Sequence, residues 1–165
     1  MATRPGKTKA TMAYSSGKPA MKAKRHLDFG GLDEHLGFQL RLAYVAVSRH
    51  FAAAMDRLDL TQKQTGVLWL IGHNGGVSQT AVANELGMDR ASMMAIIDRL
   101  EERGLLTRER SEHDGRRQAL HLTPKGRRLL SQARSALTKH EQWLTERYSP
   151  AELAMLREFI GQMGG

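Results

Sequence analysis

The sequence predicts a mainly α-helical fold with one small β-hairpin, because two periodic patterns divide the chain between them. Apolar residues recur at spacings of three and four in most stretches between residues 32 and 162, as in helices that bury one face. Residues 105–122 instead hold two short alternating runs around an Asp-Gly pair, which is a strong hairpin signal. With 165 residues, 41% of them hydrophobic, the chain has the size and composition of one domain with a sizeable core.

The net charge of +8 is unevenly distributed along the chain. Residues 1–27 hold seven Lys or Arg and no acidic residue, and residues 103–128 hold eight basic and three acidic residues. Positive charge gathered in this way is typical of proteins that contact nucleic-acid phosphates, with a merely solvated basic surface as the alternative.

The chain contains no cysteine, which excludes disulfides and thiolate nucleophiles and fits a reducing compartment. No apolar run approaches the roughly 18 residues of a membrane span, and no signal-peptide core is present. We therefore expect a cytoplasmic protein with no membrane partner.

Residues 1–31 are rich in Lys, Ala, Gly, Ser and Thr, with almost no large apolar residue before Leu27. Such a segment buries too little surface to offset its ordering entropy, so we expect a disordered basic tail over 1–31. A phosphate-contacting arm is the alternative for this segment. Residues 32–165 are expected to form a single domain.

A long helix is predicted over about 32–58. One stripe at helical spacing consists of Leu36, Leu40, Ala43, Val47, Phe51, Ala54 and Leu58, and a second of Phe38, Leu42 and Val45. Two apolar faces on one helix predict burial from two sides, as where a helix meets both its own domain and a partner chain. A fully internal helix of a monomer is the alternative.

The next predicted helix opens at Thr61 and Gln64, which have the spacing of a capping box. It should end at Gly72, and a loop follows over 73–76. Val77 is then expected to form a single short strand that pairs with the hairpin.

Residues 78–104 predict two helices joined by a tight turn. Ser78 is a good N-cap for the first helix, Gly87 can end it, and Asp89 can cap the second. The buried face of the second helix is marked by Met93, Ile96, Ile97 and Leu100. This is the pattern of a helix-turn-helix whose second helix can enter a DNA major groove.

A hairpin is predicted directly after this helix, from strands Leu105–Arg110 and Gln118–Leu122. The polar turn between them contains Asp114-Gly115, followed by Arg116 and Arg117. A hairpin in this place, with two arginines near its tip, is a wing.

Two further helices are predicted over about 123–162. Thr123 and Pro124 suit the N-cap and first position of a long helix, and Ser149 and Glu152 form a capping box for a short amphipathic one. Together with the helix over 32–58, they are expected to build a dimer interface.

Four groups of residues resemble the MarR (multiple antibiotic resistance regulator) family of winged-helix repressors. They are Asp89-Arg90-Ala91-Ser92, Leu100-Glu101-Glu102-Arg103-Gly104-Leu105, Asp114 with Arg116, and Leu122-Thr123-Pro124 with Gly126. The resemblance extends over roughly residues 32–160. It implies a winged helix-turn-helix over about 61–126, with dimerisation helices over about 32–58 and 123–162. It further implies a homodimeric repressor that binds double-stranded DNA at a pseudo-palindromic operator.

The candidate DNA contacts lie on the two short helices and the wing. They are Ser78, Gln79, Thr80, Arg90, Ala91, Ser92, Met94, Ala95, Arg99, Arg108, Arg110, Asp114, Arg116 and Arg117. Arg90 and Ser92 are the leading candidates for phosphate or base-edge contact. The apolar Ala91, Met94 and Ala95 can touch bases only through contacts such as that with a thymine methyl. Many members of the family carry polar residues at some of these places, so this sequence departs toward fewer direct hydrogen bonds.

The wing arginines are expected to divide between the two parts of the DNA. Arg116 matches the wing-tip arginine of the family, which reaches a minor groove, and Asp114 could pair with it or brace the turn. Arg108, Arg110 and Arg117 are predicted to meet phosphates, with a solvated face as the alternative.

The resemblance also implies a small effector, often aromatic and anionic, bound between the dimerisation helices and the winged domain. The candidate lining residues, chosen as polar or aromatic groups on the first two helices, are His35, Phe38, Arg41, Tyr44, Trp69 and His73. An acid of aromatic catabolism or its thioester is the preferred ligand. No cofactor is expected.

Three other functions are alternatives to this one. An enzyme is disfavoured because the sequence holds no HExxH pair, Gly-rich phosphate loop or nucleophile elbow. A metal-sensing regulator would need His35, His50 and His140 to converge in a folded dimer. A sequence-independent architectural DNA binder fits the basic tail and the alanine-rich reading face, but the Asp-x-Arg wing and the implied two-fold symmetry favour a specific operator.

Overall fold

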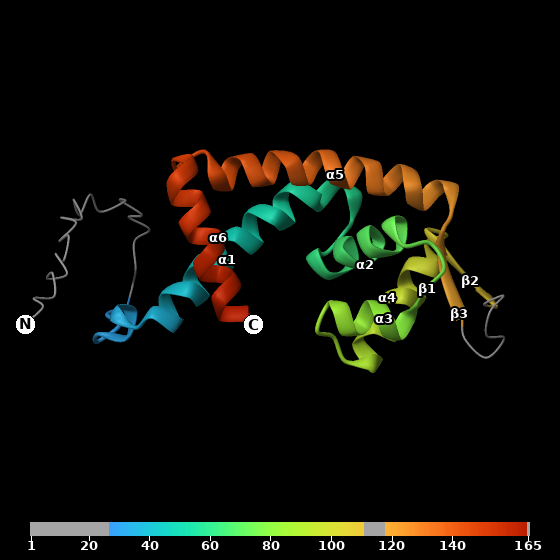
Figure 1. The fold of residues 1–165 in the computed structure, drawn as a ribbon, viewed down its shortest axis with the longest axis horizontal. Helices are drawn as coiled ribbons and strands as arrows, with labels where there is room; N and C mark the ends of the chain where they lie inside the picture. The colour runs from blue at the N-terminus through green and yellow to red at the C-terminus, as the bar shows by residue number, and fades with distance from the viewer. Residues whose placement is uncertain (1–26, 111–117, 165) are drawn as a thin grey trace, which may run out of the picture.

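The structure is a computed structural model that describes residues 27–110 and 118–164. In these ranges it is mainly helical with a three-stranded antiparallel sheet, which confirms the predicted fold class. The long helix α5 (Pro124–Thr145) runs along one side of the molecule (Figure 1). Helices α2, α3 and α4 and the sheet lie under one end of α5, and α6 (Pro150–Gly164) turns back at the other end toward α1. Of the tail predicted over 1–31, residues 1–26 lie outside the described residues, and residues 27–31 form a bend and a turn before η1.

The helix predicted over 32–58 is divided into three pieces. A 3-10 turn, η1 (Leu32–Glu34), precedes α1 (Leu36–Met55), and a second 3-10 turn, η2 (Asp56–Leu58), follows it. The regular helix is therefore shorter than the apolar periodicity suggests. It gives way to tighter turns at both ends, and η2 is followed by a left-handed residue, Asp59, with φ 48°.

Helix α2 (Gln62–His73) begins with the predicted capping box. The Thr61 hydroxyl accepts a hydrogen bond from the Gln64 amide at 3.2 Å, and the Gln64 side chain accepts one from the Thr61 amide at 2.9 Å. The helix continues one residue past Gly72, so its predicted end was one residue early. Capping of this kind fixes where α2 starts relative to the end of α1.

The predicted helix-turn-helix consists of α3 (Gln79–Glu85) and α4 (Arg90–Glu102). The Ser78 hydroxyl accepts from the Ala81 amide at 3.2 Å, which confirms the first predicted cap. Gly87 adopts φ 59° in the turn, a conformation that side-chain-bearing residues rarely take.

The sheet pairs β1 (Val77–Ser78), β2 (Leu106–Arg110) and β3 (Gln118–Leu122) in the order β1-β3-β2. Val77 lies opposite Leu120, and Leu106 lies opposite Leu122. The predicted strand at Val77 and the two strands of the wing are thus confirmed, while the turn over 111–117 lies outside the described residues.

Helices α5 and α6 begin at their predicted caps. The Thr123 hydroxyl accepts from the Gly126 amide at 3.0 Å, and the Ser149 amide donates to the Glu152 carboxylate at 2.8 Å. Hydrogen bonds from the backbone and hydroxyl of Ser149 hold the pKa of Glu152 below its ordinary value. At Gly126 an added Cβ would overlap the carbonyl of Leu105, so only glycine lets α5 approach the sheet this closely.

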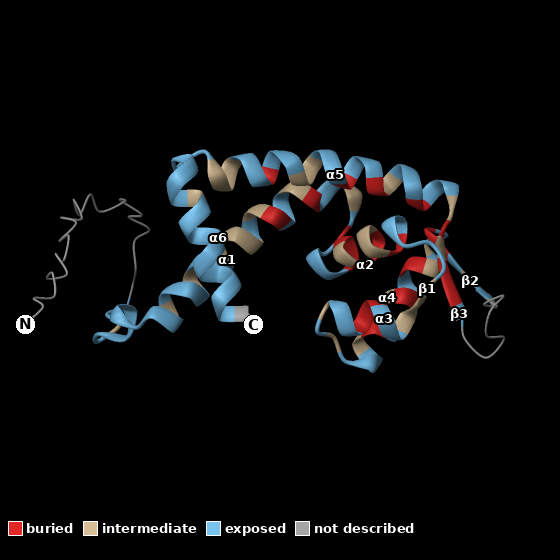
Figure 2. Ribbon diagram, in the orientation of Figure 1, coloured by how far each residue is buried: buried red, intermediate tan, exposed pale blue. Residues whose placement is uncertain are grey.

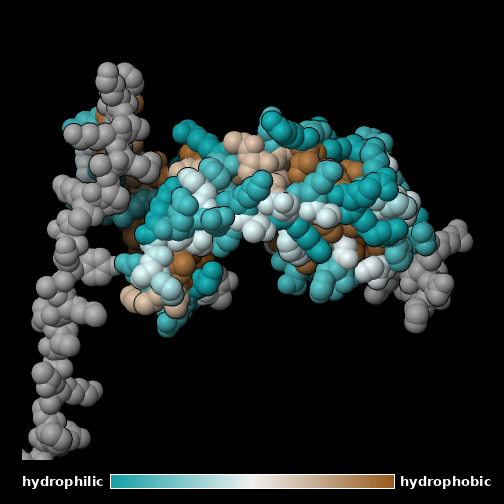
Figure 3. Space-filling model, turned by 90° about the horizontal axis from the view of Figure 1, so that it is seen from above, coloured by the Kyte–Doolittle hydropathy of each residue, from teal (hydrophilic) through white to brown (hydrophobic). Residues whose placement is uncertain are grey.

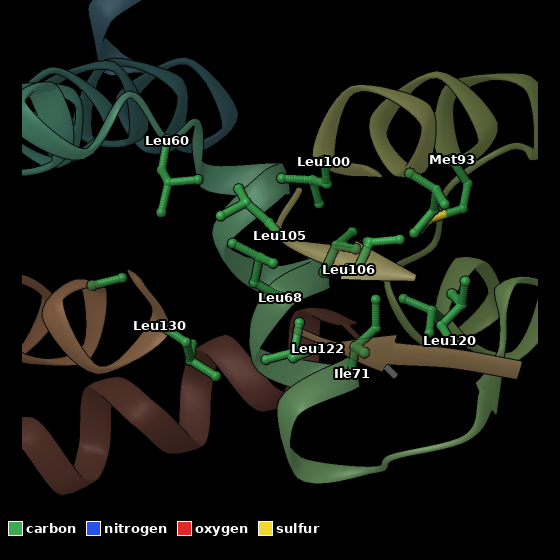
Figure 4. Close-up of a cluster of buried hydrophobic side chains, with 14 of the residues drawn as sticks. Leu60, Leu68, Ile71, Met93, Leu100, Leu105, Leu106, Leu120, Leu122 and Leu130 are labelled. Carbon is green, nitrogen blue, oxygen red and sulfur yellow. The ribbon is translucent and has the colours of Figure 1, made fainter. Parts of the chain in front are cut away.

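The hydrophobic core lies between α2, α4, the sheet and the first half of α5 (Figure 4). Its fully buried side chains include Leu68, Ile71, Met93, Ile97, Leu100, Leu105, Leu106 and Leu120. Three of the four residues predicted to face the core from the second short helix are buried, and Ile96 is half-buried against them. The winged part is therefore packed within one chain.

The opposite end of the molecule is largely exposed (Figure 2). Its exposed large apolar side chains include Leu32, Leu36 and Leu40 before and in α1, Tyr148 before α6, and Met155, Leu156, Phe159, Ile160 and Met163 in α6. Figure 3 shows brown and tan apolar surface among teal surface at the end that holds α6. Exposure of so many large apolar residues in one region is typical of a surface that another chain covers.

Candidate nucleic-acid interface and adjoining cavities

The N-terminal turn of helix α4 is exposed to solvent, while one face of the helix is buried in the core. Asp89 caps it, because its carboxylate accepts from the Ser92 amide at 2.8 Å. Hydrogen bonds from the side chain and the backbone of Ser92 hold the pKa of Asp89 below its ordinary value of 3.8, so the cap stays ionised near neutral pH. The helix start is therefore ordered before any ligand arrives.

Five of the predicted contacts are exposed on α4, among them Arg99, which also lines a cavity described below. The other four lie nearer the start of the helix. Arg90, Ala91, Met94 and Ala95 are exposed, and Met94 retains 52% exposure although it is a large apolar residue. An apolar side chain of this kind on the outer face of a recognition helix suits contact with a thymine methyl. Ser92 is half-buried, with its amide already bonded to Asp89.

The predicted contacts at the start of α3 have different surroundings. The hydroxyl of Ser78 serves the helix cap, Gln79 is half-buried and Thr80 is exposed. Of the three, Thr80 is the side chain that solvent, and hence a phosphate, reaches most freely.

Arg108 is held within the chain, in contrast to the prediction that it meets phosphates. Its guanidinium pairs with Asp98, and its Nη1 donates to the Glu101 carboxylate at 2.8 Å. The Arg108 side chain is only 21% exposed. We therefore assign it to bracing β2 of the wing against α4, because its charge is already matched by two carboxylates.

The remaining wing residues are described only in part. For Arg110 the structure describes the backbone, at the end of β2. Asp114, Arg116 and Arg117 lie outside the described residues, so their predicted roles stay predictions.

Two adjoining cavities lie where α1, α2 and α4 meet. One, of ≈ 440 Å³, is lined by residues of α2 and α4 that include Lys63 and Arg99. The other, of ≈ 400 Å³, is lined mainly by the last turns of α1 and by the segment that follows η2, with Phe51 and Met55 among its apolar walls. They share Tyr44, Thr61 and Gln62. Volumes of this size suit a small molecule.

One polar atom in this region lacks a partner. The Ser48 hydroxyl is buried and has no hydrogen-bond partner among the described residues, and Ser48 lines the ≈ 400 Å³ cavity. An unsatisfied buried hydroxyl costs about 1–3 kcal/mol. A ligand oxygen or amide placed in the cavity would supply the missing hydrogen bond.

The six residues predicted to line an effector site are not brought together. Tyr44 alone among them lines the cavities. Phe38 packs edge-on against Phe29, Trp69 lies under the guanidinium of Arg134, and His35, Arg41 and His73 are exposed. The cavity residues that sequence reasoning missed, such as Ser48 and Met55, carry no pattern other than ordinary helical spacing.

Two of the three histidines considered for metal sensing do meet. His50 and His140 lie between α1 and α5 with their Nδ1 atoms 2.7 Å apart, so one ring donates to the other. His35 precedes His50 by fifteen residues along α1, which corresponds to about 22 Å. Among the described residues, no group of three or more metal-ligating side chains is found.

Burial of His140 affects its protonation. Desolvation, and then the neighbouring charge of His50, lower the pKa of His140 below its ordinary value of 6.5, and Glu141 opposes this in part. The two rings stack with Trp143, whose ring is 3.8 Å from that of His50.

In the part of the chain that is described, no helix combines the length and the apolar character that crossing a bilayer requires.

The comparisons with known proteins agree with this geometry. The MarR family model matches residues 58–117. A curated relative, the putative transcriptional regulatory protein for the hcr operon of Thauera aromatica, is 36% identical over 146 residues, which are 88% of this chain and 88% of the relative.

Two solved structures of the transcriptional repressor CouR share this fold. One, bound to a 23-mer DNA duplex, is 36% identical with a TM-score of 0.78 and matches 86% of this chain and 100% of its own. Another, bound to p-coumaroyl-CoA, is 36% identical with a TM-score of 0.76 and matches 84% of this chain and 97% of its own. The chain therefore belongs to the MarR family, and it is a DNA-binding transcriptional regulator rather than an enzyme.

Proposed function

We propose that the chain is a homodimeric repressor that binds a pseudo-palindromic operator and is released by an aromatic acyl thioester. DNA binding is supported by the start of α4, which is exposed and capped by Asp89. The opposite face of the same helix is anchored in the core by Met93, Ile97 and Leu100, which are fully buried. A recognition helix held this firmly presents one fixed face to a major groove. The operator would lie in the cytoplasm, where we place the protein.

Dimerisation follows from the apolar surfaces that one chain leaves uncovered. Of the described side chains in α6, only Leu153 is even half-buried, although Phe159 and Ile160 are large and apolar. The first half of α1 also exposes Leu36 and Leu40. A two-fold partner would cover both regions and place two copies of α4 about 34–36 Å apart, one helical turn of DNA.

The DNA contacts we propose divide into two kinds. Ala91, Met94 and Ala95 would contact thymine methyls in the major groove, and Arg90 would bind a phosphate or base edge. From the wing, Arg110 and Arg117 would bind phosphates and Arg116 would enter the minor groove.

The effector class follows from the chemistry of the two cavities. The ≈ 400 Å³ cavity has apolar walls from Phe51, Ala52 and Met55 together with the unpartnered Ser48 hydroxyl, which suits an aryl group with a hydroxyl or carbonyl. The adjoining ≈ 440 Å³ cavity has the cationic Lys63 and Arg99 at its walls, which suits anionic phosphates. An aryl thioester of coenzyme A joins both parts in one molecule, and CouR binds p-coumaroyl-CoA.

Release of DNA tests this proposal directly. Full-length protein is first used to select an operator from random duplexes, and its complex with that operator is titrated with p-coumaroyl-CoA, p-coumarate or coenzyme A. We expect release by the thioester alone, because only the thioester fills both cavities. Release by p-coumarate at equal concentration would assign the site to free acids, and no release by any of the three would contradict the effector class.

A matched pair of variants locates the site. Ser48→Ala should weaken release by p-coumaroyl-CoA by about 1 kcal/mol or roughly fivefold, the scale of one hydrogen bond. Ser135→Ala, an exposed serine on α5, should leave release unchanged.

A sequence-independent architectural binder is the second candidate, and the alanine-rich outer face of α4 is the observation that favours it. In that case the selection would enrich no common sequence.

A further inference from the structure

We propose that Arg103 is a positioning residue that fixes the angle of the recognition helix relative to α1, and thereby the operator spacing that the dimer accepts. This inference rests on the proposed dimeric repressor. Arg103 follows the last residue of α4, and its side chain is 25% exposed. Its guanidinium reaches away from the DNA-facing start of α4 toward the segment that ends α1.

The contacts of Arg103 are bidentate and directed at backbone. Its Nη1 donates to the Asp59 carbonyl at 2.6 Å, and its Nη2 donates to the Leu58 carbonyl at 3.0 Å. The Asp59 carboxylate lies 3.6 Å from Nη1. A planar guanidinium held at two points fixes orientation as well as distance, which a single hydrogen bond does not.

The same end of α4 is held from its other side by α5. Lys125 Nζ donates to the Arg103 carbonyl at 2.7 Å, and the Thr123 hydroxyl donates to the Gly104 carbonyl at 2.7 Å. The end of the recognition helix is thus fixed between the segment after α1 and the start of α5. Because α1 and α5 belong to the framework of the dimer, this joint sets how α4 is oriented in it.

The geometry makes spacing sensitive to this joint. Helix α4 has thirteen residues and is about 20 Å long, so a rotation of about 10° at its end moves its start by about 3.4 Å, the rise of one base pair. Asp56 and Asp59, on either side of Leu58, also line the ≈ 400 Å³ cavity. Arg103 therefore links the wall of that cavity to the end of the recognition helix.

Operator-spacing selectivity tests the inference without any effector. The full chain and its Arg103→Ala, Arg103→Gln and Arg103→Lys variants are titrated with the operator that the wild type selects, and with versions that have one base pair added or removed at the centre. Arg57→Ala is the matched control, because Arg57 is an exposed arginine of η2 and its substitution removes one positive charge, as Arg103→Ala does.

We expect the wild type and Arg57→Ala to prefer the selected spacing by about fivefold or more, the lower range of ordinary coupling between sites. Arg103→Ala should bind the three spacings almost equally, and Arg103→Lys should restore part of the preference because an ammonium reaches one carbonyl but does not fork. The dependence of affinity on salt should be the same for Arg103→Ala and wild type, since Arg103 contacts carbonyls and not phosphates.

Two contrary results would overturn the inference about Arg103, and a third would contradict the proposed function. An Arg103→Ala protein that keeps the wild-type spacing preference overturns the inference and leaves the repressor intact. A salt slope lowered by about one unit would make Arg103 a phosphate contact and also overturn it. A wild type that selects no operator with two half-sites contradicts the proposed function itself. If thermal unfolding shows that Arg103→Ala does not fold, Arg103→Gln, which keeps one donor group, decides between these results.

Discussion

Arg116 is the residue on which DNA specificity is expected to depend most. It follows the Asp-Gly pair at the predicted wing tip, where a guanidinium can enter a minor groove that is narrow in A·T-rich DNA. Arg116→Ala should weaken specific binding by about 1–3 kcal/mol and relax the preference for A·T steps beside each major-groove contact. Arg116→Lys should recover only part, because an ammonium is more strongly hydrated. Titration of operators with A·T or G·C flanks measures this, and an equal loss on both would reduce the wing to an electrostatic contact.

His140 should make the stability of the protein depend on pH. Its pKa is lowered in the folded state, so its contribution to the free energy of unfolding is complete above 6.5 and is lost as the pH falls below that value. The slope for one proton is at most about 1.4 kcal/mol per pH unit. The groups that face its ring are His50 and Phe51 from α1 and Trp143 from α5.

Urea denaturation of wild type and His140→Gln between pH 7.5 and 5.5 measures this effect. We expect the wild type to lose stability faster than His140→Gln as the pH falls, while His73→Gln, an exposed histidine at the end of α2, behaves as wild type. Parallel curves for wild type and His140→Gln would show that burial of this ring is not linked to protonation.

The wing and α4 act as one unit at the scale of elements, because Arg108 in β2 pairs with Asp98 and Glu101 in α4. Arg108→Ala should destabilise the protein by up to about 1 kcal/mol, since both carboxylates remain partly solvated. It should not change the dependence of DNA affinity on salt, because this charge is not available to a phosphate. Arg110→Ala is the matched comparison and should lower the salt slope by about one unit. A lowered slope for Arg108→Ala would return Arg108 to the phosphate contacts.

The starts of α2 to α6 could be predicted because their signals are local, whereas α1 begins without a side-chain cap and its start was placed too early. Ser78, Asp89, Thr123 and the capping boxes each bond an amide three residues away, so the local sequence is enough to predict them. The partner of Arg108 could not be found in this way, since Asp98 lies ten residues earlier on a different element. Whether Arg108 binds a DNA phosphate or a carboxylate of α4 depends on tertiary packing, which the local sequence does not show.

The residues that line the two cavities could not be predicted from the sequence for a similar reason. The ≈ 400 Å³ cavity is lined by residues 44–62, where the chain turns from α1 into α2, and the ≈ 440 Å³ cavity adds residues of α4. Both depend on how the chain turns after α1, which helical spacing alone does not predict. Of the polar and aromatic residues predicted on the first two helices, Tyr44 lines both cavities, whereas Ser48, which lines one of them, was not among the predicted residues. The 3-10 turn that ends α1 was missed because Leu58 continues the apolar spacing of the helix.

At the scale of the whole molecule, the uncovered apolar surfaces of α1 and α6 predict that the dimer is the folded functional unit. Ile160→Glu would place a charge where the second chain is expected to pack, and Ile160 is 57% exposed in one chain, so the monomer should still fold. Sedimentation equilibrium should change from twice 18.4 kDa for wild type to 18.4 kDa for Ile160→Glu, with loss of operator binding. Arg157→Glu, an exposed charge on the same helix, is the control. A wild type that sediments as a monomer at micromolar concentration would contradict the dimer.

A symmetric pair of α4 helices is expected to recognise a specific DNA sequence, and the ratio of specific to non-specific affinity tests this most directly. Full-length protein is titrated at one fixed salt concentration with the selected operator and with a scrambled duplex of the same length and composition. We predict tighter binding to the operator by about a thousandfold or more, with two protomers per duplex. Affinities within about tenfold of each other would contradict the claim, because phosphate contacts alone would then account for binding.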